Sequence, residues 1–159
     1  MNTAIIYFSR NGSCRIAAEL ISRQTGGSIT ELVPVHPFTG FLYAGYSSVA
    51  QKKIKLAGIP EETVKTASRL VLISPVWAGR KNPVMNSFLA DAVLTGKSVD
   101  LITVQADPRK SSMERVLPAF RDMVLERGGT VRSLTALHGA SVGKTASRED
   151  LAAQLASFQ

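Results

Sequence analysis

Short apolar stretches alternate along this chain with longer segments in which apolar residues recur every three or four positions. A near-continuous apolar run of strand length predicts a strand that is covered on both faces, and the longer spacing predicts a helix. Strands are predicted at residues 3–8, 28–33, 70–73, 99–104 and 130–137. Helices are predicted at 13–24, from Pro83 up to Gly96, from the end of the loop 105–112 to Arg127, and from Ser147 onward, and residues 61–67 are predicted to form a short helical turn or a connector.

Strict alternation of strands and helices is typical of a doubly wound α/β protein. Five strands with helices between them predict three layers around a parallel sheet, and the right-handed crossover rule favours the strand order 2-1-3-4-5. In that order the strands at 3–8 and 70–73 are neighbours, and the chain reverses its direction of travel between them. Ligands bind in the crevice beyond the carboxyl ends of such a pair, so we expect the functional site there.

Some local details of this scheme can be predicted as well. Pro118 falls inside a helical pattern, where it should kink the helix or restart it. Residues 35–55 are interrupted by proline and glycine and are compatible with a helix over about 42–53. The inward faces are predicted to carry Ile16, Leu20 and Ile21 in the first helix, and Val84, Phe88, Leu89, Ala92 and Val93 in the third.

The loop Ser9–Cys14 joins the first predicted strand to the first predicted helix. Unpaired N–H groups and the positive end of the helix dipole converge at such a junction, and the hydroxyls of Ser9 and Ser13 can join them. The stretch therefore predicts a phosphate site. The alternative is an ordinary strand–helix turn that a serine caps.

A second loop, Pro75–Asn82, follows the most hydrophobic predicted strand and contains the only tryptophan of the chain, Trp77. In the predicted strand order this loop flanks the same switch point as Ser9–Cys14. Trp77 lies beside Pro75 and Gly79 rather than within an apolar stripe, which favours a ligand contact for its ring. Trp77 could instead fill the core beneath the loop.

Composition narrows the class of protein. The chain has 159 residues, 45% of them hydrophobic, and neither a repeat nor a linker divides it, so one domain over 1–159 is expected. Its single cysteine excludes an intrachain disulfide and a cysteine-rich metal site. No apolar run approaches the roughly 18 residues of a membrane span, and the N-terminal residues lack signal-peptide features, so a cytoplasmic location is expected.

The formal charge of +7 could indicate a nucleic-acid partner. The basic residues are scattered, however, without a block of like charges or interleaved aromatic residues. We therefore expect neither a nucleic-acid nor a membrane partner.

At its two conspicuous loops the chain resembles the flavodoxin family of FMN proteins. The family's phosphate loop, Thr/Ser-x-Thr-Gly-x-Thr, corresponds to Ser9-Arg10-Asn11-Gly12-Ser13-Cys14, in which Asn11 and Cys14 replace threonines. The family's apolar run into Pro-x-Trp-x-Gly corresponds to residues 72–79, with Pro83 following. The resemblance covers the whole chain in length and element order, is strongest over 4–24 and 70–94, and implies a flavodoxin-like fold.

The resemblance also implies FMN as the cofactor and gives each loop a role. The flavin would perform the redox chemistry, so no catalytic side chain and no metal are expected. Trp77 would pack on the isoalloxazine ring. The phosphate would be held by Ser9, Arg10, Asn11, Gly12, Ser13 and Cys14, and the ring would be bordered by Pro75, Val76, Ala78, Gly79, Gln105, Ala106 and Asp107.

Much of the positive charge falls in the three loops at this end of the predicted sheet: Arg10, Arg15, Arg80, Lys81, Arg109 and Lys110. A basic mouth would attract NAD(P)H, an anionic quinone-like substrate or an acidic protein surface. The resulting hypothesis is an FMN-binding redox protein, either an electron carrier or a small NAD(P)H-dependent reductase. The alternative is a flavin-free interaction module with a degenerate phosphate loop.

Overall fold

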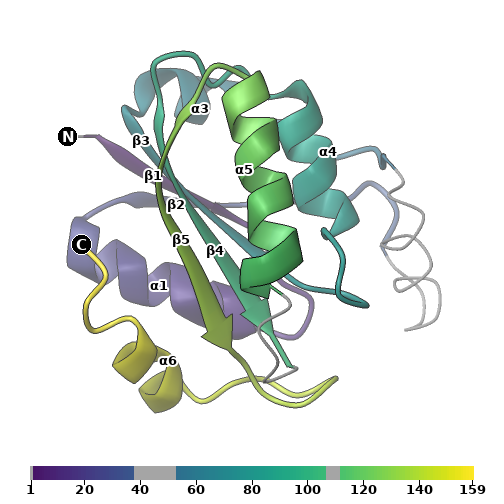
Figure 1. Ribbon diagram of the computed structural model, residues 1–159, viewed down its shortest axis with the longest axis vertical. Helices are drawn as coiled ribbons and strands as arrows, with labels where there is room; N and C mark the ends of the chain where they lie inside the picture. Colours follow the sequence, from purple (N-terminus) through teal and green to yellow (C-terminus); the bar gives the residue numbers. More distant parts are fainter. Residues whose placement is uncertain (1, 38–52, 107–111) are drawn as a thin grey trace.

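A five-stranded parallel sheet forms the centre of the computed structural model, which describes residues 2–37, 53–106 and 112–159 (Figure 1). Its strands are β1 (Thr3–Tyr7), β2 (Ser28–Glu31), β3 (Arg69–Pro75), β4 (Ser98–Gln105) and β5 (Thr130–His138). They lie in the order β2-β1-β3-β4-β5, and every neighbouring pair is parallel. The strand order predicted from the sequence is therefore confirmed.

Helices cover both faces of this sheet, with α1 and α6 on one side and α4 and α5 on the other (Figure 1). No helix in the described ranges is long and apolar enough to cross a membrane. The helix predicted over about 42–53 falls outside the described residues, except for Lys53, which is not helical. The helical elements are α1 (Ser13–Thr25), α3 (Glu61–Thr66), α4 (Pro83–Asp91), a π-helical turn η1 (Ser112–Val116), α5 (Leu117–Glu126) and α6 (Arg148–Gln154).

Both faces of the sheet contribute to the core, because side chains alternate along each strand. On β1, Ile5 packs in the cluster that includes α1 and α6, whereas Ile6 packs in the cluster that includes α4 and α5. Neither side chain retains measurable exposure. Burial on both faces explains why the central strands are almost continuously apolar in the sequence.

The buried face of α1 differs from the predicted one. Its centre is formed by the small side chains of Cys14, Ala17 and Ala18, together with Ile21, whereas Ile16 and Leu20 lie at its margins and are only partly buried. Small residues let the helix backbone approach the sheet closely, so the centre of the interface needs little side-chain volume. A rule that ranks positions by hydrophobicity selects the larger marginal residues instead.

The end of α4 also departs from the prediction. Gly96 was expected to end this helix, but the backbone already becomes extended at Ala92. This change leaves Val93 74% exposed and turns Leu94 fully into the core. The amide of Leu94 then donates to the carbonyl of Arg127, so a tertiary contact decides where the helix ends.

Pro118 restarts a helix, which is one of the two outcomes predicted for it. It lies in the first two residues of α5, where a missing N–H is tolerated because that group has no partner within the helix. The preceding turn, η1, is π-helical.

A buried ion pair ties the amino-terminal ends of β3 and β4 together. The Nε of Arg69 lies 2.7 Å from Oδ2 of Asp100, and their side chains are 6% and 1% exposed. The hydroxyl of Ser133 donates to the second carboxylate oxygen. Arg69 also donates to the carbonyl of Gln159 at 2.6 Å, and its guanidinium lies 5.4 Å from the ring centroid of Phe158. The pair thus anchors the last residues of the chain to the sheet.

Replacing Arg69 by methionine should lower the free energy of unfolding by about 3 kcal/mol, because it leaves the Asp100 carboxylate buried without its main counter-charge. Arg121→Met is the matched control, since Arg121 pairs with Asp122 at an exposed site, and it should change stability by less than about 1 kcal/mol. Urea unfolding followed by Trp77 fluorescence measures both values. Equal effects of the two substitutions would contradict this role for the buried pair.

Candidate functional site

A cavity of about 580 Å³ lies at the carboxyl ends of the strands, where the loops after β1, β3, β4 and β5 meet. Its lining residues are Arg10, Asn11, Ser13, Cys14, Pro75, Val76, Trp77, Ala78, Val104, Gln105, Ala106, Gly139, Ala140, Val142, Gly143 and Thr145. The first three loops are those singled out in the sequence. Among the predicted site residues, Ser9, Gly12 and Gly79 are described but do not line the cavity, and Asp107 lies outside the described residues.

The loop after β1 presents backbone donors to this cavity. Gly12 adopts a left-handed conformation with φ of 93°, and α1 begins at the next residue. The first helical hydrogen bond from this end runs from the amide of Ile16 to the carbonyl of Gly12 at 3.0 Å. The N–H groups of Ser13, Cys14 and Arg15 consequently have no carbonyl partner within the helix, and the positive end of its dipole lies there.

The side chains of Ser9 and Ser13 also make hydrogen bonds within the protein. The Oγ of Ser9 accepts a hydrogen bond from the Gly12 amide at 3.1 Å, so Ser9 shapes the loop from outside the cavity. The Oγ of Ser13 accepts from the Ala146 amide at 2.9 Å. The Cys14 thiol is buried, and loss of solvation raises its pKa above its usual range. Cys14 is therefore a neutral thiol that can donate only weakly.

Trp77 begins a tight turn in the loop after β3, which also lines the cavity. Ala78 and Gly79 have positive φ values of 50° and 64°, and the Arg80 amide donates to the Trp77 carbonyl at 2.9 Å. Ala78 is the only residue other than glycine with positive φ in the described ranges, which strains the turn locally. The turn holds the half-buried Trp77 beside the cavity.

Two side chains from the segment that follows β1 contact the Trp77 ring. The ring of Phe8 meets it edge to face, with centroids 5.7 Å apart and an interplanar angle of 77°. The guanidinium carbon of Arg10 lies 5.5 Å from the Trp77 ring centroid, a cation–π contact. The phosphate-loop candidate and the aromatic candidate are thus in direct contact through Arg10.

The end of β4 forms a further wall. Gln105 is buried, and its side-chain Oε1 accepts a hydrogen bond from the Ser112 hydroxyl at 2.6 Å. Its carbonyl accepts from the Gly139 amide at 2.7 Å, which joins the loop after β4 to the loop after β5. Gln105 therefore fixes the wall through bonds on both sides, and Ala106 lines the cavity beside it.

The loop after β5, residues 139–146, forms the remaining wall of the cavity and was not among the predicted site residues. This segment follows β5 and contains Gly139, Gly143 and Lys144-Thr145. Two glycines and a basic residue beyond the end of a strand are the signal that could have revealed it, because all parallel strands end at one edge of the sheet. The segment contributes Gly139, Ala140, Val142, Gly143 and Thr145 to the cavity lining.

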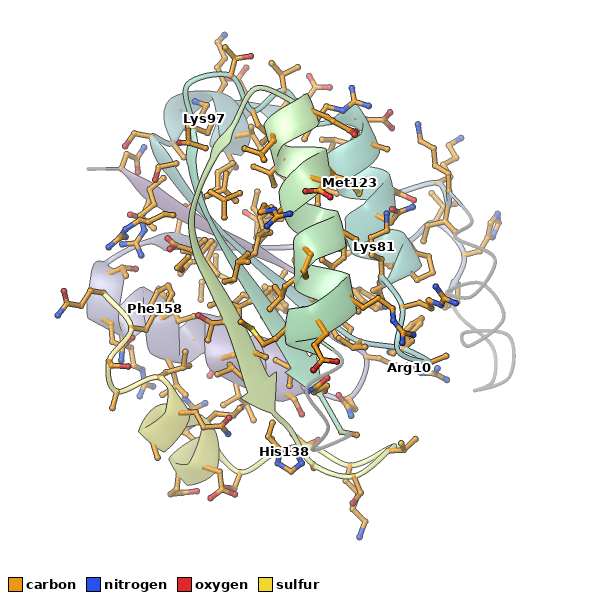
Figure 2. All side chains as sticks on the ribbon, in the orientation of Figure 1. Arg10, Lys81, Lys97, Met123, His138 and Phe158 are labelled. Carbon is orange, nitrogen blue, oxygen red and sulfur yellow. The ribbon has the colours of Figure 1, made fainter. Side chains whose placement is uncertain are left out.

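Among the described residues, fewer basic side chains lie at the cavity than the sequence predicted. Arg10 lines the cavity, but Arg15 pairs with Glu31 at the end of β2, at 2.9 Å, and donates to the hydroxyl of Tyr7 at the end of β1. Lys81 is directed to α5, where its Nζ lies 3.3 Å from the sulfur of Met123 (Figure 2). Burial lowers the pKa of Lys81, and the charge of Glu126 partly opposes that shift.

Of the remaining basic residues predicted at the mouth, Arg80 is exposed on the Trp77 turn and does not line the cavity. Arg109 and Lys110 lie outside the described residues. In the described part of the chain, Arg10 is the one basic side chain that lines the cavity.

The sequence matches no protein-family model and no curated protein, but many solved structures share its fold. A candidate flavoprotein from Bacteroides uniformis superposes with a TM-score of 0.77 at 17% identity, covering 98% of each chain. Flavodoxin 2 from Bacillus cereus gives 0.67 at 18% identity, over 99% of this chain and 94% of the other. A flavoprotein in complex with FMN from Lactobacillus acidophilus gives 0.66 at 18% identity, over 85% and 92%.

These likenesses, together with the parallel sheet order β2-β1-β3-β4-β5, show that the chain has the flavodoxin-like fold. The cavity lies at the switch point between β1 and β3, where that class of fold binds its ligands.

The buried Cys14 thiol predicts a dependence of stability on alkaline pH. Below about pH 8.5, the ordinary pKa of a thiol, the group is neutral in both the folded and unfolded chains and contributes no pH dependence. At higher pH only the unfolded chain ionises, so the free energy of unfolding should fall by up to about 1.4 kcal/mol per pH unit. Cys14→Ala should show a shallower decline. Urea titrations between pH 7 and 10 measure both slopes, and equal slopes would contradict a neutral buried thiol.

Proposed function

We propose that this chain binds FMN in the cavity at the switch point and acts as a flavodoxin-like redox protein. The observation that carries the proposal is that one cavity is lined both by the start of α1, with its unpaired backbone donors, and by the half-buried Trp77. The Lactobacillus acidophilus protein with this fold was solved in complex with FMN.

The donor end suits a phosphate. The amides of Ser13, Cys14 and Arg15 have no partner within the helix, and a dianion there would interact favourably with the helix dipole. The left-handed Gly12 lets the chain turn into the helix at this point. The neutral Cys14 thiol adds little, so the backbone is expected to supply most of the phosphate contacts.

The part of the cavity that Trp77 lines suits a flat aromatic ring. Val76, Val104 and Ala140 give the cavity apolar walls, and the Trp77 ring offers a surface for stacking. A bound flavin would supply the electron-transfer chemistry. The protein would orient the ring, exclude water from it, and place the positive charge of Arg10 nearby.

Two roles follow from such a site, an electron carrier and a small NAD(P)H-dependent reductase. Arg10 at the cavity and Arg80 on the adjacent turn give this edge positive charge. Positive charge at the mouth favours anionic reductants such as NAD(P)H, anionic quinone-like substrates, or the acidic surface of a partner protein.

FMN added to the purified protein should quench the fluorescence of Trp77 in a saturable manner, with a dissociation constant in the micromolar range or below. The physical reason is stacking of the flavin ring against the only tryptophan of the chain. Fluorescence titration checks the quenching, and calorimetry measures the affinity without relying on the Trp77 signal. No detectable binding of micromolar FMN in either measurement would contradict the proposal and favour a flavin-free interaction module.

Arg10→Met should weaken FMN binding about tenfold and lower the reduction potential of the bound flavin. The substitution removes a cation that can pair with the phosphate and that favours added electrons on the ring. Arg80→Met is the matched control, because Arg80 is exposed on the Trp77 turn and does not line the cavity, and it should change the affinity less than twofold. Tighter binding by Arg10→Met would mean that Arg10 competes with the flavin for Trp77.

A further inference from the structure

The phosphate-loop candidate is hydrogen-bonded directly to the loop after β5. The side-chain Nδ2 of Asn11 donates to the carbonyl of Lys144 at 2.6 Å. The hydroxyl of Thr145 donates to the carbonyl of Asn11, and the amide of Ala146 donates to the Oγ of Ser13 at 2.9 Å. Residues separated by more than 130 positions in sequence are thereby held side by side at the donor end of the cavity.

Close packing accompanies these bonds. A Cβ atom placed on Gly12 would lie 3.3 Å from Cγ2 of Thr145, so the two loops are already in near contact. At the other end of the segment, the Gly139 amide donates to the Gln105 carbonyl, and a Cβ on Gly139 would lie 3.0 Å from Cγ1 of Val104. Both ends of the segment 139–146 are therefore fixed against the sheet edge.

The elements behind the segment are anchored too. The Oγ of Ser147 accepts a hydrogen bond from the Asp150 amide at 3.1 Å and so caps the start of α6. The side chain of Arg148 pairs with Glu19 on α1. Asn11 and Thr145 supply contacts that hold the carboxyl end of the segment onto the loop after β1.

We propose that Asn11 is a positioning residue, which holds the segment 139–146 in place as a fixed wall of the cofactor cavity. This inference rests on the proposed binding of FMN. It explains why an amide replaces the threonine of the resembled phosphate loop at this position. An asparagine N–H lies farther from the backbone than a threonine hydroxyl, so it can reach the Lys144 carbonyl of the neighbouring loop. A wall that is fixed before the ligand arrives spares the ordering entropy that binding would otherwise require.

The substitution Asn11→Thr distinguishes this positioning role from the alternative that Asn11 merely replaces a hydroxyl donor to the phosphate. If Asn11 merely substitutes for a hydroxyl donor, restoring threonine should tighten FMN binding. If Asn11 positions the wall, the same substitution removes one of the three hydrogen bonds that hold the segment 139–146 onto the loop after β1 and should weaken FMN binding about fivefold, the effect of losing one ordinary hydrogen bond. The two hypotheses therefore differ in the sign of the change.

The experiment measures amide hydrogen exchange of residues 140–146 in the protein without FMN, and FMN affinity by calorimetry. We expect Asn11→Thr to accelerate that exchange about fivefold and to weaken affinity by a similar factor. Asn2→Thr is the matched control, because Asn2 also donates through its side chain to a carbonyl, that of Thr66, at the opposite end of the sheet. It should change neither quantity.

A second pair of variants guards against an effect peculiar to threonine at position 11. Thr145→Val keeps the side-chain shape but removes the hydroxyl that donates to Asn11, and it should shift exchange and affinity in the same directions. Thr130→Val is its control, since the Thr130 hydroxyl donates to the Lys97 carbonyl far from the cavity.

Unchanged exchange in Asn11→Thr would overturn the positioning role, and so would faster exchange with unchanged or tighter FMN binding. Failure of the unaltered protein to bind FMN would contradict the proposed function. Exchange in the segment would then still decide whether Asn11 holds the wall.

Discussion

All five strands run in one direction, and this constraint fixes where the site can be. The carboxyl ends of parallel strands meet at the same edge of a sheet, so the loops after β1, β3, β4 and β5 must converge there. The loop after β1 leads to α1 on one face, and the loop after β3 leads to α4 on the other (Figure 1). Together with the loops after β4 and β5, these diverging loops line the cavity of about 580 Å³.

The two edges of the sheet use polar groups for different purposes. At the amino-terminal edge, Arg69 and Asp100 are buried against each other and against the last residues of the chain, where they serve the fold. At the carboxyl edge, the side chains of Asn11 and Gln105 bond to neighbouring loops. Helix N–H groups and the Trp77 ring border the cavity there, and hydrogen bonds between the surrounding loops fix the shape of its walls.

Much of the fold could be predicted from local patterns, because each strand buries both faces and each helix buries one. The predictions of which residues are buried were wrong where a residue's surroundings mattered more than its own hydrophobicity. Ala17 and Ala18 occupy the centre of the α1 interface because the sheet lies close to the helix there. Val93 is exposed because burial of Leu94 ends α4 early. Neither outcome follows from the hydrophobicity of the residues alone.

The sequence by itself determined the order of elements, the strand order of the sheet and three of the four loops at the cavity, since apolar periodicity and turn residues are local properties. Tertiary structure alone decided what the loop side chains do. Arg15 is drawn away by Glu31 and Lys81 by the α5 face, while Arg10 stays on Trp77. The segment 139–146 joins the cavity through hydrogen bonds to residues more than 130 positions away, and no local pattern encodes a contact of that range.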